Sequence, residues 1–163
     1  MRSLAAQHHL ALQTLASGDE LNIGAVHALV LGPTRLIRAG SVQNNASIVL
    51  DVRSHGLRLL MTGDIEKEAA ASVVAQLRQL PDAPPVDVLK VPHHGSANQD
   101  PQLEHTVHAP IAVISVGAHN DYGHPAPRTL DLLAQSDSTV LRTDRGGDIV
   151  IMATNGAPLV ARP

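Results

Sequence analysis

Three stretches of the sequence place Asp or His directly after an apolar, strand-like run. Residues 88–91 lead into the Pro-His-His-Gly-Ser segment 92–96, residues 57–61 lead into Thr62-Gly63-Asp64, and residues 111–116 lead into a loop that carries His124. In α/β proteins, ligands are usually handled by loops that leave the carboxyl ends of strands. We therefore expect the side chains of Asp64, His93, His94 and His124 to gather at one rim.

Each of these residues also has an ordinary structural interpretation. Asp64 precedes a helical pattern and is typical of a helix N-cap. His124 lies between Gly123 and Pro125, which favours a rigid turn, and Asn44 and Asn45 are turn-forming residues. The remaining histidines considered follow helix and strand patterns without mutual spacing, and we interpret them as structural or surface residues: His8, His9, His27, His55, His105 and His108.

The composition limits what the chain can be. Its 163 residues, 44% of them hydrophobic, are enough for one domain with a core, and this core must be aliphatic because there is no Phe or Trp and only one Tyr. Cysteine is absent, so any metal would need His, Asp or Glu ligands. The formal charge of −3 provides no general basic field for a polyanion, so contacts with nucleic acid would be local. No apolar run approaches the roughly 20 residues of a membrane span, and we expect a soluble segment.

The residue pattern predicts a single α/β domain over residues 1–163. Its second half alternates strands and helices, whereas its first half is mostly hairpin. The predicted helices cover residues 3–16, 64–80 (with Asp64 as N-cap), 100–107 and 127–135. The predicted strands cover residues 20–23, 25–31, 47–53, 57–61, 86–91, 111–116, 139–142, 148–152 and 158–161, and residues 34–46 form a loop.

Together the motifs resemble one known family. In chain order they are Asn-Asn-Ala-Ser-Ile-Val-Leu at 44–50, Leu-Met-Thr-Gly-Asp at 60–64, Asp-Val-Leu-Lys-Val-Pro-His-His-Gly-Ser at 87–96, Ser-Val-Gly-Ala-His-Asn-Asp-Tyr-Gly-His-Pro at 115–125, and Arg-Thr-Asp at 142–144. This series resembles the metallo-β-lactamase-fold domain at the carboxyl end of the ComEC competence proteins, which are membrane channels for DNA uptake. The resemblance extends over residues 15 to 155 and implies an αββα sandwich.

The resemblance also implies a site. Asp64 matches the aspartate that bridges two metal ions, and His124 matches a later histidine that binds the second ion. His93 and His94, with Ser96 nearby, match the loop that contacts the phosphate or assists the leaving group. Asn44 or Asn45, of which we choose Asn45, falls near a position where many relatives have a further histidine ligand. Two Zn²⁺ or Mn²⁺ ions would acidify a shared water and hold the phosphoryl oxygens of a phosphodiester.

One part of the family pattern is missing. A His-x-His-x-Asp-His run normally lies early in the domain, and no such run occurs here. The chain therefore resembles the second half of the sandwich, and we predict that alone it binds metal weakly and catalyses little. Strands missing from the sheet would leave an edge or an apolar face exposed, which predicts association with another copy of the chain.

Three functions remain open at this point. The first is a nuclease or phosphodiesterase domain of a DNA-uptake protein, which would contact the phosphate backbone of DNA and the membrane channel of the same polypeptide, outside the bacterial plasma membrane. The second is a non-catalytic module of that protein, which guides DNA or supports the channel. The third is a hydrolase of the same fold that acts on a small phosphoester. The lone Tyr122 argues against an aromatic platform for bases and favours contacts to phosphates.

Overall fold

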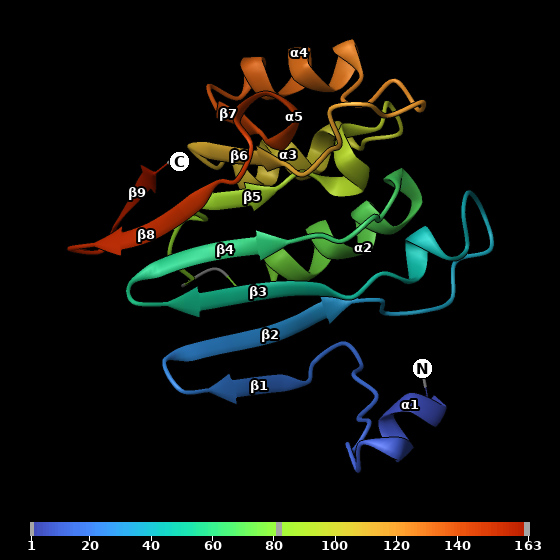
Figure 1. Ribbon diagram of the computed structural model, residues 1–163. Helices are drawn as coiled ribbons and strands as arrows, with labels where there is room; N and C mark the ends of the chain where they lie inside the picture. Colours follow the sequence, from blue (N-terminus) through green and yellow to red (C-terminus); the bar gives the residue numbers. More distant parts are fainter. Residues whose placement is uncertain (1, 81–82, 162–163) are drawn as a thin grey trace.

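The computed structural model describes residues 2–80 and 83–161, and its main feature is a seven-stranded sheet in which the strands follow chain order. The first four strands form antiparallel hairpins: β1 (Glu20–Ile23), β2 (Val26–Gly32), β3 (Val49–Ser54) and β4 (Leu57–Met61). The next three continue the sheet in parallel: β5 (Val88–Lys90), β6 (Ile111–Ile114) and β7 (Thr139–Arg142). Figure 1 shows this change from hairpins to crossovers, which the sequence predicted.

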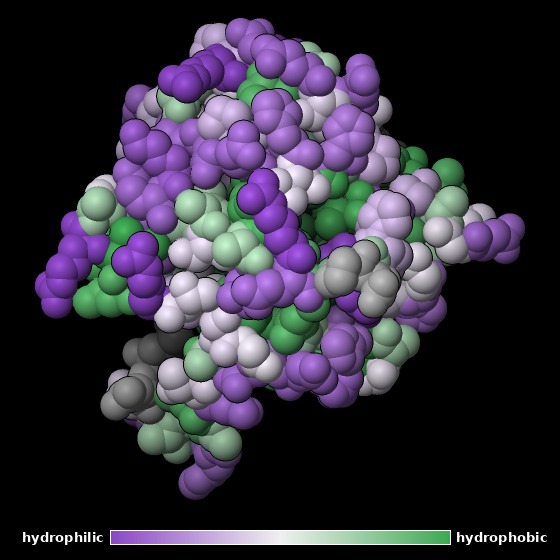
Figure 2. All heavy atoms as spheres, turned by 180° about the vertical axis from the view of Figure 1, so that it is seen from behind, coloured by the Kyte–Doolittle hydropathy of each residue, from purple (hydrophilic) through white to green (hydrophobic). Residues whose placement is uncertain are grey.

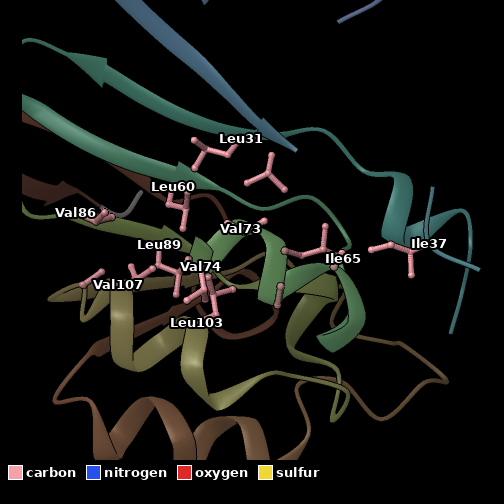
Figure 3. Close-up of a cluster of buried hydrophobic side chains, with 14 residues drawn as sticks. Leu31, Ile37, Leu60, Ile65, Val73, Val74, Val86, Leu89, Leu103 and Val107 are labelled. Carbon is pink, nitrogen blue, oxygen red and sulfur yellow. The ribbon is translucent and has the colours of Figure 1, made fainter. Parts of the chain in front are cut away.

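Helices join the parallel strands and cover one face of the sheet. They are α2 (Lys67–Arg78), α3 (Pro101–Val107) and α4 (Pro127–Gln135), and short helical turns lie at η1 (Asn44–Ala46), η2 (Pro92–Gly95) and α5 (Thr143–Gly146). Leu60 and Leu89 project from neighbouring strands against Val73 of α2 and Leu103 of α3 (Figure 3). This aliphatic core holds the ends of the parallel strands in fixed positions.

The other face of the sheet is covered in part by a second, two-stranded sheet. Its strands are β8 (Val150–Thr154) and β9 (Ala157–Ala161), and Ile151 and Val160 pack against Val88, Ile111 and Leu141. Met61, Met152 and Leu159 are exposed. In the view of Figure 2, apolar residues reach the surface in several separate patches. Association with a second copy of the chain stays a prediction.

A buried ion pair fixes the end of the sheet away from the carboxyl ends of the parallel strands. Arg58 on β4 meets the Asp51 carboxylate on β3 through both Nε (2.8 Å) and Nη2 (3.1 Å). The Arg58 backbone N–H donates to the Asp87 side chain just before β5, and its Nη1 donates to the Pro84 carbonyl. Since a bidentate Arg–carboxylate pair has a defined geometry, these contacts help to set the register of β3, β4 and β5.

The predicted helix over residues 3–16 is wrong beyond its first turns. Helix α1 covers only Arg2–Gln7, and His9 has a left-handed φ of 52°. Ser17 Oγ donates to the Leu31 carbonyl, and Gly18 N–H donates to the Val30 carbonyl. These hydrogen bonds hold the segment before β1 against β2. Leu10 and Leu12 are exposed. An amphipathic spacing produces a helix only where its apolar face finds a partner, and these two leucines have no core to enter.

The prediction that Asp64 caps the next helix is also wrong. Helix α2 begins at Lys67, and its N-cap position is taken by Glu66, whose side chain makes no capping hydrogen bond. The Glu66 backbone N–H donates instead to Asn45 Oδ1 at 2.9 Å. Asp64 lies two residues earlier, where its carboxylate is free to face other loops.

Candidate functional site

The carboxyl ends of β4, β5 and β6 bring the predicted site residues together. Asp64 follows β4, His93 and His94 follow β5, and His124 lies in the loop after β6. His94 Nε2 lies 3.6 Å from Asp64 Oδ1. The His93 ring lies edge-on to the other two histidines, with centroid distances of 6.3 Å to His94 and 5.6 Å to His124. The structure therefore assembles these four side chains at one rim, and their chemical roles stay predictions.

The backbone of the two adjacent histidines is unusual. His93 (φ 46°, ψ 48°) and His94 (φ 54°, ψ 22°) both adopt the left-handed region, which residues other than glycine seldom occupy. Their conformation is held by the His93 N–H, which donates to the Gly63 carbonyl, and by the Ser96 N–H, which donates to the His93 carbonyl. Strain of this kind persists only where the surroundings enforce it, and it is concentrated at functional sites in proteins.

The orientation of His94 is fixed by a single strong contact. Its Nδ1 lies 2.6 Å from the Ser115 carbonyl oxygen, which can only accept, so Nδ1 carries a proton. This leaves Nε2 directed at Asp64. The Lys90 ammonium approaches the same carboxylate at 3.9 Å and donates to the Gly63 carbonyl at 2.9 Å. Burial lowers the pKa of Lys90, and the nearby Asp64 carboxylate partly opposes this effect.

Two glycines allow the loops of the site to pack closely. A Cβ on Gly95 would lie 2.6 Å from Pro125 Cβ, and a Cβ on Gly63 would lie 2.7 Å from Ser47 Cβ. Both glycines also have a positive φ. The Gly95 carbonyl accepts a hydrogen bond from the Ala126 N–H at 2.8 Å, which ties the His93–His94 loop to the loop of His124. The motif therefore needs glycine at 95 for packing as well as for conformation.

Ser96 supports this loop from behind. It is buried, and its Oγ accepts from the Asn98 N–H. Its carbonyl accepts from Thr129 Oγ1 at 2.7 Å and from Gln99 Nε2 at 2.9 Å. These contacts give Ser96 a structural part in the loop, and its predicted catalytic part stays untested.

Glu66 belongs to this site, and the sequence reasoning did not assign it there. It is buried, and its carboxylate accepts from the Ser41 N–H (2.9 Å) and from Asn44 Nδ2 (3.2 Å) and lies 3.7 Å from His93 Nδ1. The only signal in the sequence is its position two residues after Asp64, which is equally typical of a favourable negative charge in the first turn of a helix.

The contacts of Asn44 favour one tautomer of His93. A carboxylate only accepts, so the atom of Asn44 that faces Glu66 is the amide nitrogen. The same nitrogen lies 3.5 Å from His93 Nε2. This contact favours Nε2 as the acceptor and Nδ1, which faces Glu66 without a hydrogen bond to it, as the protonated nitrogen of a neutral ring. Asn45, in contrast, is buried with its amide bonded to the Glu66 N–H and the Ala39 carbonyl. Of the two asparagines, Asn44 is the one that reaches the histidines.

His124 is held through its backbone by Asn120. Asn120 Oδ1 accepts from the His124 N–H, and Asn120 Nδ2 donates to the His124 and Gly117 carbonyls. The imidazole Nδ1 of His124 is buried and has no hydrogen-bond partner. Desolvation lowers the pKa of His124, and the neighbouring His93 and His94 lower it further.

The donor atoms suit a divalent metal only in part. Carboxylate oxygen and imidazole nitrogen are ligands for Zn²⁺ or Mn²⁺, and the unpartnered Nδ1 of His124 would gain a partner from a cation. Across the described ranges 2–80 and 83–161, however, no three His, Asp or Glu side chains lie close enough together to hold a metal ion. These residues alone do not form a complete metal shell.

Comparisons with known proteins relate the chain to a much longer one. No family model matches it. It is 34% identical over 146 residues to ComE operon protein 3 of Bacillus subtilis (strain 168), an alignment that covers 89% of this chain. The chain is a homologue of a segment of that protein. It spans 18% of the length of this relative.

A solved structure supports the fold. A candidate metal-dependent hydrolase from Parabacteroides distasonis ATCC 8503 matches with a TM-score of 0.53 and 16% identity, over 85% of this chain and 61% of that one. At this identity the likeness concerns the fold alone, and it confirms the predicted α/β sandwich. The finer prediction, that the chain is the second half of such a sandwich, stays a prediction. Nowhere in the described part of the chain is there a helix of the length and hydropathy that a membrane crossing requires.

Proposed function

We propose that this chain forms part of a metal-dependent phosphodiesterase that cleaves DNA within a longer competence protein. The observation that carries the proposal is the pair Asp64 and His94, which face each other 3.6 Å apart at the ends of adjacent parallel strands. A carboxylate that can hold a cation, beside an imidazole that can carry a proton, brings together two kinds of group that phosphodiester hydrolysis uses. The relation to ComE operon protein 3 supports the assignment to DNA uptake.

The residues of this chain have distinct parts in the proposed reaction. Asp64 offers its half-exposed carboxylate to a cation, and His124 offers a ring nitrogen, Nδ1, that has no hydrogen-bond partner. His94 would hand a proton from Nε2 to the departing alkoxide when both of its ring nitrogens are protonated. Glu66 and Asn44 fix the ring of His93 beside the phosphate position. When bound, divalent metal supplies a hydroxide at neutral pH and positive charge against the phosphoryl oxygens.

The remaining metal ligands would come from a part of the longer protein outside the printed sequence. One finding supports this part of the proposal: the described residues hold no group of three metal donors. In the parent protein, the chain would lie on the extracytoplasmic side of the plasma membrane, attached to the channel, and would contact the phosphate backbone of DNA.

The incomplete donor set also favours a second candidate function, that of a non-catalytic module which guides DNA. The two candidates differ in one assay. The longer homologous protein and the printed chain are each supplied with Mn²⁺ or Zn²⁺ and given a DNA strand or a small phosphodiester. We expect the longer protein to cleave DNA in preference to the small diester and the printed chain to show little activity.

Two results of this assay would contradict the proposal. Failure of the longer protein to cleave any phosphodiester in either metal would leave the non-catalytic module as the better account. Robust cleavage by the printed chain alone, abolished by Asp64→Ala, would show that the site needs no ligand from elsewhere.

A further inference from the structure

A pocket of about 140 Å³ opens directly beside the rim. Six residues line it: His94, Val116, Gly117, Asn120, Tyr122 and His124. Two of them, His94 and His124, belong to the candidate site itself. If a phosphate lies at Asp64 and His94, a group attached to that phosphate is within reach of this pocket.

One wall of the pocket is formed by the aromatic ring of Tyr122, which is not part of the hydrophobic core. Tyr122 is 84% exposed, and the chain has no other Tyr and no Phe or Trp. Its ring stacks on that of His124, with centroids 6.0 Å apart and planes inclined by 23°. Because Asn120 ties both ends of the loop through its bonds to Gly117 and His124, the ring is presented on a braced segment.

The chemistry of the lining selects the kind of group that fits. No carboxylate lines the pocket, and its one tyrosine is less than the cage of aromatic rings that holds a quaternary ammonium group such as choline. Val116 and the ring of Tyr122 offer apolar contacts, and the position of a Cβ on Gly117 is open. A flat, uncharged ring is the best match, since a base stacked on an aromatic side chain gains about 1–3 kcal/mol.

We propose that this pocket receives an unpaired nucleobase next to the scissile phosphate, stacked on Tyr122, so that the substrate is single-stranded. This inference rests on the proposed phosphodiesterase function. A base inside a duplex has both faces covered by its neighbours and cannot enter. The sequence argues against an aromatic platform, because one tyrosine cannot stack on several successive bases. A single ring suffices for one base.

The single tyrosine makes a direct test possible. The printed chain, labelled with ¹³C only in tyrosine, gives ring signals from Tyr122 alone. Oligodeoxythymidylate and oligodeoxyadenylate are expected to shift these signals upfield, whereas an abasic strand of equal length and a blunt duplex are not. The abasic strand is expected to bind at least about fivefold more weakly, which corresponds to the lower limit of base stacking.

Two variants make the test specific. Tyr122→Phe keeps the ring and is expected to retain the preference for bases, whereas Tyr122→Ala is expected to bind normal and abasic strands equally. The inference is overturned if the wild-type chain binds both strands equally, if no base-bearing strand shifts the ring signals, or if phosphocholine shifts them and thymidine monophosphate does not.

The cleavage assay on the longer protein separates this inference from the function on which it rests. If the longer protein cleaves abasic and normal strands with equal kcat/KM, the base pocket is wrong while the phosphodiesterase stands. If it cleaves neither strand, the proposed function fails as well.

Discussion

In a protein that joins this chain to the part supplying the remaining metal ligands, Asp64→Asn is expected to lower the kcat for cleavage of a DNA strand by about 10²- to 10³-fold. In this account Asp64 holds the cation that stabilises negative charge in the transition state, and loss of one such stabilising group typically has an effect of this size. Asparagine keeps the shape of the side chain but removes the negative charge that faces Lys90 and His94. Because Asp64 makes no capping hydrogen bond to α2, the substitution leaves the start of the helix intact.

The matched control for this prediction is Asp148→Asn, which makes the same chemical change at an exposed position outside the rim. This control is expected to retain wild-type kcat, and both variants are expected to unfold at the same urea concentration as the parent. Equal activity of Asp64→Asn and Asp148→Asn would show that Asp64 has no part in the reaction and is a structural residue of the loop.

A second large effect concerns a buried carboxyl group away from the rim. Glu104 on α3 is 1% exposed, and neither of its side-chain oxygens has a hydrogen-bond partner. Burial raises the pKa of Glu104 to about 7 from an ordinary value of 4.5, and Asp100 contributes to the increase. The folded chain therefore retains a proton at pH values where the unfolded chain has lost it.

The sign of the pH dependence follows from this difference. The stabilising contribution of protonated Glu104 is complete below pH 4.5 and is lost as the pH rises through 7. At about 1.4 kcal/mol per pKa unit, the loss amounts to about 3 kcal/mol of unfolding free energy. Glu104→Gln does not titrate, so the difference in unfolding free energy between the variant and the parent is expected to grow by about 3 kcal/mol from pH 4 to pH 8.

Urea unfolding followed by far-ultraviolet circular dichroism measures this difference at each pH, and contributions from other titrating groups cancel between the two proteins. Glu104→Met, which removes both unpartnered oxygens, is expected to be more stable than the parent at pH 8. A difference between Glu104→Gln and the parent that stays constant from pH 4 to pH 8 would show that Glu104 titrates normally in the folded chain.

Much of the fold was predictable because the signals were local. The hairpins of the first half, the α2 pattern and the strand before His93 all appear in the structure near their predicted positions. The gathering of Asp64, His93, His94 and His124 followed from the rule that parallel strands end at one edge. The helix over residues 3–16 failed because its spacing carried no information about whether Leu10 and Leu12 would find a core.

Other parts of the site could not be predicted because they depend on contacts between distant segments. Glu66 reaches the rim only because the Asn45 side chain holds its backbone and Ser41 and Asn44 hold its carboxylate, and these partners lie more than 20 residues away. The left-handed backbone of His93 and His94 likewise depends on the position of the Gly63 carbonyl. The sequence showed Tyr122 as the lone tyrosine of the chain, but its exposure and its stacking on His124 depend on the folded loop.

The measurement that tests the central account most directly is the metal content of a protein that joins this chain to the part supplying the remaining ligands. It is measured with Asp64 and with Asp64→Asn, after equilibration with Mn²⁺ or Zn²⁺ and removal of free metal. The account predicts that the wild-type protein retains divalent metal, that Asp64→Asn loses most of it, and that the printed chain alone retains little. Equal metal content in the wild-type protein and Asp64→Asn would contradict the assignment of this rim as the metal site.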